Sequence, residues 1–134
     1  MLIPLESKYI RDPITLGGKI KNRRLALNLR QSEIAEIIQV SVDSITNWEN
    51  NLSEPQIHFY PKIFSFLGCY PFTENCVLPY QIKKCRYIHG LTQNQFGKKI
   101  GVDGSTICSW ETGETKPRNQ YLNRLQKYLV KISD

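Results

Sequence analysis

The side chains best suited to metal binding or nucleophilic catalysis are four cysteines and two histidines. They are Cys69, Cys76, Cys85, Cys108, His58 and His89. Zinc sites use closely spaced pairs such as Cys-x-x-Cys, whereas six, eight and twenty-two residues separate the successive cysteines here. The spacing favours reduced thiols that fill small apolar spaces. It predicts no metal and no other cofactor.

Motifs for enzymatic chemistry are missing from the sequence. It contains no glycine-rich phosphate loop, no His-Glu-x-x-His motif and no set of Ser, His and Asp residues beyond what chance supplies. A cysteine with His58 or His89 would be the one nucleophile pair available, but each cysteine has the simpler apolar role. We therefore expect that the protein is not an enzyme.

Length, composition and charge narrow the class of protein further. The 134 residues have room for one ordinary domain or two very small ones, and 40% hydrophobic with 22% charged residues is globular composition. No apolar run approaches the ~20 residues that cross a bilayer, and no secretion signal is visible, so we expect a cytoplasmic protein without a membrane partner. The net charge of +6 divides into +1 for residues 1–68 and +5 for residues 69–134. A basic balance favours polyanionic partners.

An internal repeat with an offset of 62 residues runs through most of the chain. Without gaps, Trp48-Glu49 recurs as Trp110-Glu111, and Pro55 recurs as Pro117. Other identical pairs in this register are Ile20/Ile82, Lys21/Lys83, Arg24/Arg86, Leu29/Leu91, Gln31/Gln93, Ile38/Ile100, Val40/Val102, Ile45/Ile107 and Leu67/Leu129. A shared register of this length indicates duplication. The predicted organisation is an N-terminal arm (1–14), two domains (15–68 and 79–134) and a linker (69–78).

Hydrophobic residues recur with a helical period in both copies, and no segment alternates as a strand would. The predicted helices are 16–28, 31–37, 42–50 and 61–67 in the first copy, and 79–89, 93–100, 104–112 and 120–132 in the second. Ser41, Thr92 and Asp103 are predicted helix caps. The fold class is therefore all-α, with two small helical domains joined by a short packed linker.

The apolar residues of this linker leave two arrangements open. Tyr70, Phe72 and Val77 either pack between the copies and fix their angle, or cover the edge of their own copy.

The second copy contains, between Ile82 and Pro117, nearly every residue of a known sequence motif. Its matching residues are Arg86, Gly90-Leu91-Thr92-Gln93, Phe96-Gly97, Ile100-Gly101-Val102-Asp103, Thr106-Ile107, Trp110-Glu111 and Gly113. This pattern resembles the xenobiotic-response-element (XRE) or phage repressor-Cro family of helix-turn-helix proteins. The first copy departs from it at four positions, with Asn28, Arg30, Gln39 and Asn51 in place of Gly, Thr, Gly and Gly. Asparagine tolerates the left-handed conformation of glycine better than glutamine does.

The resemblance implies a tandem repressor-like regulator whose two recognition helices, about 42–50 and 104–112, enter the major groove of DNA. The positions implied to face bases are Val42, Asp43, Thr46, Asn47, Gly104, Ser105, Cys108 and Ser109. The positions implied to face phosphates are Arg30, Gln31, Ser41, Lys83, Lys84, Gln93, Lys116 and Arg118, with helix capping as the alternative for the two glutamines. The resemblance also implies internal ion pairs, Arg24 with Glu49 and Arg86 with Glu111, in place of phosphate contacts by those arginines.

The residues at base-facing positions include no Arg, Lys or Gln, so strong bidentate reading of guanine is not expected. Asn47 suits adenine, Asp43 suits the amino group of cytosine, and Val42 suits the thymine methyl group, whereas Ser105 and Ser109 are permissive. We therefore expect the first copy to supply more base discrimination and the second more backbone affinity.

The predicted partner is double-stranded DNA, bound by a monomer acting as a pseudo-dimer or by a homodimer. The alternative is a protein-binding module, antitoxin-like or a scaffold, that keeps the fold and binds a partner protein through domain 1. In that alternative, DNA binding is weak or confined to domain 2.

Overall fold

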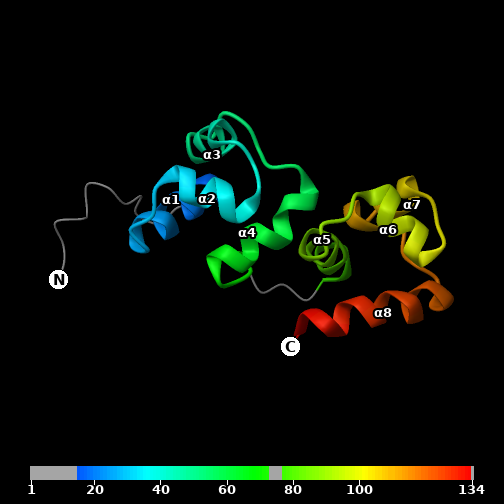
Figure 1. Cartoon of the computed structure of the whole chain (residues 1–134). Helices are drawn as coiled ribbons and strands as arrows, with labels where there is room; N and C mark the ends of the chain where they lie inside the picture. Colours follow the sequence, from blue (N-terminus) through cyan, green and yellow to red (C-terminus); the bar gives the residue numbers. More distant parts are fainter. Residues whose placement is uncertain (1–14, 73–76, 134) are drawn as a thin grey trace. The chain divides into compact units, whose positions relative to one another are not determined.

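The computed structural model describes residues 15–72 and 77–133, with side chains as far as Leu129. The all-α prediction is confirmed within these residues, which form helices and no strand (Figure 1). The helices are α1 (Leu16–Ala26), α2 (Gln31–Ile38), α3 (Val42–Glu49), the 3-10 turn η1 (Ile57–Phe59), α4 (Tyr60–Leu67), α5 (Leu78–Ile88), α6 (Gln93–Ile100), α7 (Gly104–Thr112) and α8 (Asn119–Ser133). No helix in this part of the chain is long and apolar enough to span a membrane. The predicted N-terminal arm (1–14) and Cys76 lie outside the described residues.

The chain divides into two compact units, and the boundary in the sequence lies between Pro71 and Phe72. Each unit has five fully buried side chains at positions that are equivalent in the repeat. These pairs are Ile20/Ile82, Ile34/Phe96, Ile38/Ile100, Ile45/Ile107 and Ile63/Leu125. A tryptophan closes each core: Trp48 lies 5.8 Å from the ring of Phe59, and Trp110 lies 5.7 Å from the ring of Tyr121, measured between centroids. The duplication therefore extends to the packing of the cores.

Three corners in each unit use left-handed backbone conformations at equivalent positions. The φ angles are 60° at Asn28, 68° at Gln39 and 61° at Asn51, against 68° at Gly90, 97° at Gly101 and 79° at Gly113. Of the three residues at these corners in the first unit, glutamine is the type least suited to a left-handed conformation. Gln39 adopts the same conformation as the glycine of the second unit, and its side-chain oxygen accepts a hydrogen bond from Lys62.

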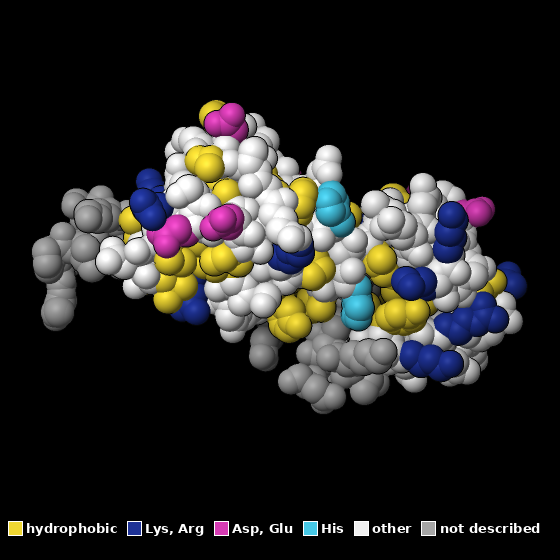
Figure 2. Space-filling model, in the orientation of Figure 1, with side chains coloured by type: hydrophobic (Ala, Val, Ile, Leu, Met, Phe, Trp, Pro, Cys, Tyr) yellow, Lys and Arg dark blue, Asp and Glu magenta, His cyan; other side chains and the backbone are white. Residues whose placement is uncertain are grey.

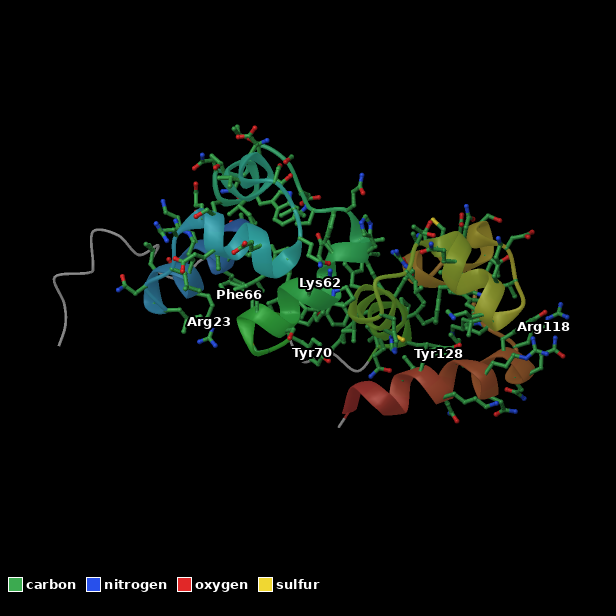
Figure 3. The ribbon with its side chains drawn as sticks, viewed as in Figure 1. Arg23, Lys62, Phe66, Tyr70, Arg118 and Tyr128 are labelled. Carbon is green, nitrogen blue, oxygen red and sulfur yellow. The ribbon has the colours of Figure 1, made fainter. Side chains whose placement is uncertain are left out.

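A cation from the last helix of each unit lies at this same corner. In the second unit the equivalent residue, Arg124, donates from Nη1 to the carbonyl oxygen of Ile100 at 2.7 Å. In the first unit Lys62 lies on α4, as Figure 3 shows. A positive charge near the C-terminal end of a helix is stabilising, because the carbonyl groups there carry partial negative charge.

Two of the three predicted caps form the expected hydrogen bonds. Ser41 Oγ accepts from the backbone N–H of Ser44 at 3.2 Å, and Thr92 Oγ1 accepts from that of Gln95 at 3.1 Å. The prediction for Asp103 is wrong in part. Asp103 occupies the N-cap of α7, but its exposed side chain makes no capping hydrogen bond.

The aromatic residues of the predicted linker contact their own units. The Tyr70 ring meets Phe64 edge-on with centroids 5.7 Å apart, and the Phe72 ring meets Tyr80 edge-on at 6.4 Å. The Lys84 ammonium group lies 5.9 Å above the centroid of the Phe72 ring. Each of these contacts lies within one unit.

Only part of the prediction for the cysteines holds. Cys85 is fully buried, and this burial raises the pKa of its thiol to about 12. Cys69 and Cys108 are exposed, so the expectation that they fill apolar spaces is wrong. Cys69 follows the glycine that ends α4, and Cys108 lies on the solvent side of α7, where no core surface reaches them.

We expect iodoacetamide at pH 8 to alkylate Cys69 and Cys108 in the folded protein and to spare Cys85. The thiolate is the reactive species, and a pKa of about 12 leaves roughly one thiol in ten thousand ionised at this pH. Peptide mass spectrometry measures the modification, with the same reaction in guanidinium chloride as the control that labels all three. Alkylation of Cys85 at the rate of Cys108 in the folded protein would contradict the burial.

Candidate nucleic-acid interface

A buried ion pair fixes the third helix of each unit against the first. Arg24 donates from Nε and Nη2 to the two Glu49 oxygens, at 2.7 and 2.8 Å. Arg86 makes the same bidentate contact with Glu111, at 2.7 and 3.0 Å. The hydrogen bond that Arg24 donates to Glu49 raises the pKa of Arg24. Both expected ion pairs are therefore present, and they hold these arginines inside the units.

The glutamine that begins the second helix of each unit joins this buried pair. Gln31 donates from Nε2 to Glu49 Oε1 at 3.0 Å, and Gln93 donates from Nε2 to Glu111 Oε1 at 3.3 Å. Neither side chain acts as a helix cap. Both residues are half-buried, so each remains at the edge of the surface that the resemblance assigns to phosphate contacts.

The third helix of the first unit presents the predicted base-facing residues with unequal exposure. Val42 and Asp43 are exposed, and Asn47 is half-buried. Thr46 is also half-buried, and its hydroxyl lies 2.9 Å from Gln31 Oε1 and 3.1 Å from the carbonyl oxygen of Val42. The hydroxyl group of Thr46 therefore points towards α2 and its own helix and not towards solvent.

In the second unit, one predicted base-facing residue is not exposed. Ser105 and Cys108 are exposed and Ser109 is half-buried, whereas Gly104 is buried. The side chain of Asn94, on α6, covers Gly104, and a Cβ atom at Gly104 would lie 1.9 Å from Asn94 Oδ1. The expectation that Gly104 belongs to the exposed face is therefore wrong. Asn94 takes part in this surface instead, and no motif or spacing predicts this role.

The predicted phosphate-facing cations differ in their environments. Lys83, Lys116 and Arg118 are exposed, and Figure 3 shows Arg118 at the start of α8 pointing outward. Arg30 is exposed, and its Nε lies 3.4 Å from the Glu33 carboxylate. A hydrogen bond from the Arg30 backbone N–H, at 2.8 Å, lowers the pKa of that carboxyl group.

Charge at equivalent surface positions differs strongly between the units. Lys98, Lys116 and Arg118 of the second unit correspond to Glu36, Glu54 and Gln56 of the first. In the view of Figure 2, Lys and Arg side chains gather most densely over α6 to α8, whereas most of the acidic side chains in this view lie over the first unit. The second unit therefore has the more favourable electrostatic surface for a polyanion.

Exposed hydrophobic side chains show the opposite distribution. Six large ones are exposed among the described residues, and all but Val77 belong to the first unit. These five are Leu27, Ile37, Val42, Leu52 and Tyr70. At the positions of Ile37 and Leu52, the second unit has Lys99 and Glu114.

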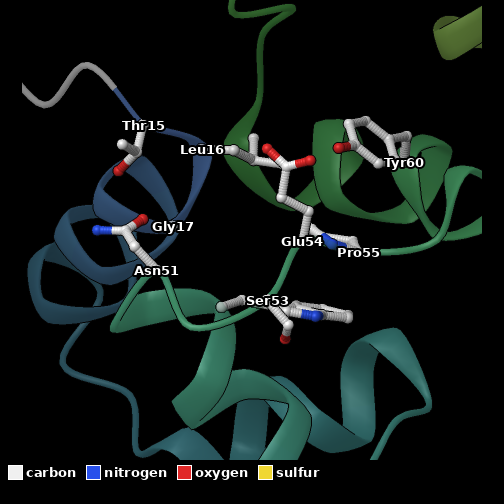
Figure 4. Close-up of a pocket in the computed structure, with 9 residues that line it drawn as sticks. Thr15, Leu16, Gly17, Asn51, Ser53, Glu54, Pro55 and Tyr60 are labelled. Atoms are coloured by element: carbon white, nitrogen blue, oxygen red, sulfur yellow. The ribbon is translucent and has the colours of Figure 1, made fainter.

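A hollow of about 330 Å³ lies in the first unit beside the start of α1 (Figure 4). Its lining includes Thr15, which caps α1 by accepting from the backbone N–H of Gly18 at 3.0 Å. Gly17 approaches α3 closely there, because a Cβ atom would lie 1.8 Å from the Trp48 carbonyl oxygen. The hollow also borders Glu54, in the loop that follows α3.

A comparison with known protein families matches the chain at two places. The model of the family described as helix-turn-helix matches residues 20–74 and again residues 82–129. Both stretches contain the complete second and third helices of a unit, and so all the predicted base-facing positions. No curated protein and no solved structure matches the chain.

Proposed function

The chain belongs to the XRE-type helix-turn-helix family, a family of DNA-binding regulators, and we propose that it is a sequence-specific transcriptional regulator that reads the major groove with both α3 and α7. The second and third helices of each unit have the lengths and the short corner of a DNA-binding helix-turn-helix.

The observation that carries the proposal is the buried bidentate ion pair behind each recognition helix. Arg24–Glu49 and Arg86–Glu111 fix α3 and α7 in equivalent positions, so each helix presents its outer side to solvent in a defined orientation. Base reading needs side chains held in this way, because the donor and acceptor groups of a base pair have fixed positions.

The unequal surfaces support a division of labour between the units. Asp43 and Asn47 on α3 have the chemistry to discriminate bases, whereas Lys116 and Arg118 beside α7 suit phosphates. In this proposal one chain covers two sites on a duplex, as a monomer acting as a pseudo-dimer or within a homodimer.

Two measurements test the function: selection of duplexes from a random pool, and a salt titration of binding to random duplex. A regulator that contacts phosphates loses affinity steeply as salt rises. We expect Asn47→Ala to keep its affinity for random duplex and to lose about tenfold for the selected one. Ser109→Ala, the equivalent change in the second unit, is the control and should leave the sequence preference nearly unchanged. Equal losses by Asn47→Ala on both duplexes would contradict base reading by α3.

A second candidate function is protein binding through the first unit. The exposed side chains of Ile37 and Leu52, with Glu36 and Glu54 near them in sequence, favour it because such a surface suits a protein better than a phosphate backbone. Flat, negligible binding to random duplex at low salt would favour this candidate over the regulator.

A further inference from the structure

A chain of hydrogen bonds connects the recognition helix of the first unit to its buried ion pair. Gln31 Nε2 faces Glu49 Oε1, and a carboxylate only accepts hydrogen bonds, so the atom there must be the amide nitrogen. The atom of Gln31 that faces Thr46 is therefore the oxygen, and the Thr46 hydroxyl donates to it at 2.9 Å. The hydrogen bonds link Thr46, Gln31, Glu49 and Arg24 in this order.

These contacts orient the amide plane of Gln31, and the single Thr46 hydroxyl proton is shared with the Val42 carbonyl oxygen at 3.1 Å. The Gln31 oxygen accepts from Thr46, and one of the two amide N–H bonds points at Glu49. One N–H remains to donate, and the amide cannot turn over without breaking both hydrogen bonds.

The second unit lacks the hydroxyl group that begins this series of hydrogen bonds. Cys108 stands where the first unit has Thr46, and a thiol is a weak donor. Gln93 keeps only the longer bond to Glu111, at 3.3 Å. No buried side-chain oxygen or nitrogen among the described residues lacks a hydrogen-bond partner, so the Gln93 oxygen faces solvent. Gln93 is therefore less constrained than Gln31.

We propose that Thr46 is a positioning residue and not a base reader: it fixes Gln31 so that the remaining amide N–H donates to a DNA phosphate. The inference rests on the proposed function, because it needs a duplex at α3. A side chain that is already ordered loses less conformational entropy on binding. The first unit is thus pre-ordered at this contact, whereas the second must order Gln93 when it binds.

The experiment compares Thr46→Val, Thr46→Ser, Gln31→Ala and the double variant Thr46→Val/Gln31→Ala, on the selected duplex and on random duplex. Valine keeps the shape of threonine and removes the donor. We expect Thr46→Val to bind both duplexes about five- to tenfold more weakly with a nearly unchanged salt slope, because a neutral amide N–H releases no counterion from the phosphate. Thr46→Ser should stay within about twofold of the wild type, and the double variant should bind as Gln31→Ala does, because both changes remove the same contact.

A base-reading threonine gives a different result. Thr46→Val would then weaken binding to the selected duplex alone, change the preference at one base pair, and add its effect to that of Gln31→Ala. That outcome would overturn the inference.

Nuclear magnetic resonance of the unbound protein tests the positioning without DNA. The Gln31 side-chain amide protons should exchange with water more slowly than those of Gln93. Thr46→Val should speed the exchange at Gln31, and Cys108→Thr should slow it at Gln93. Equal exchange at Gln31 with and without the Thr46 hydroxyl would overturn the inference. A wild-type chain that binds no duplex at any salt concentration would instead overturn the proposed function, while the exchange rates still decide whether Thr46 positions Gln31.

Discussion

Glu111→Ala should unfold the second unit at a much lower urea concentration than the wild type, with a loss of about 3–5 kcal/mol in the free energy of unfolding. The side chains of Arg86 and Glu111 are 8% and 5% exposed. Removing the carboxylate leaves the Arg86 guanidinium buried without its counter-charge and takes the acceptor from Gln93. A unit of this size has a total stability of only several kcal/mol, so most of it would be lost.

The two tryptophans allow this loss to be assigned to one unit. Trp48 lies in the core of the first unit and Trp110 in the core of the second, and the chain has no other tryptophan. In a Trp48→Phe background, fluorescence follows the second unit, and in a Trp110→Phe background it follows the first. We expect Glu111→Ala to lower the midpoint of the Trp110 transition, and Glu49→Ala to lower that of the Trp48 transition.

Two control variants test whether the loss comes from the ion pair. Glu114→Ala removes an exposed carboxylate of the same unit, which lies 3.4 Å from the Ser109 hydroxyl, and should change the midpoint little. Arg86→Met/Glu111→Leu replaces both charges by apolar groups and should cost less than the two single changes together, because no unpaired charge remains. A Glu111→Ala protein as stable as Glu114→Ala would show that the ion pair does not hold α7 in place.

The features that depend on the helical periodicity of hydrophobic residues and on the duplication could be predicted from the sequence. All eight predicted helices agree with the structure within two residues at each end, and 93–100 and 104–112 agree at both ends. The periodic spacing of isoleucines such as Ile34 and Ile38 fixed the buried face of α2. The ion pairs could also be predicted, because the family resemblance implies them and both partners recur at one offset.

The features that were missed depend on a neighbouring helix. A helical wheel places Thr46 and Gly104 on the outer side of their helices. In the structure, however, Gln31 of α2 accepts a hydrogen bond from Thr46, and Asn94 of α6 covers Gly104. Gln39 has the wrong residue type for a left-handed corner, and the contact from Lys62 on α4 is not visible in the local sequence. The 3-10 turn at Ile57–Phe59 was not predicted, because three residues are too few to show a period.

Exchanging the charged residues of two equivalent loops should move phosphate affinity from one unit to the other. Lys116→Glu/Arg118→Gln gives the second unit the residues that the first unit has at Glu54 and Gln56. We expect this variant to bind random duplex about 100-fold more weakly at low salt, with a salt slope smaller by about two phosphate contacts. Lys127→Gln removes one exposed charge on α8, outside this loop. It is the control for losing a charge away from the loop and should change affinity by about twofold or less.

The reciprocal variant distinguishes the effect of where the charges lie from the effect of the net charge. Glu54→Lys/Gln56→Arg should strengthen binding to random duplex, and all four changes together leave the net charge at +6. If the loops contact phosphates, the fourfold variant should regain most of the lost affinity through the first unit. It should then select different duplexes, because the tighter contact now lies beside α3. If Lys116→Glu/Arg118→Gln loses no more affinity than Lys127→Gln, these loop residues do not face phosphates, and the second unit attracts DNA only through its overall charge.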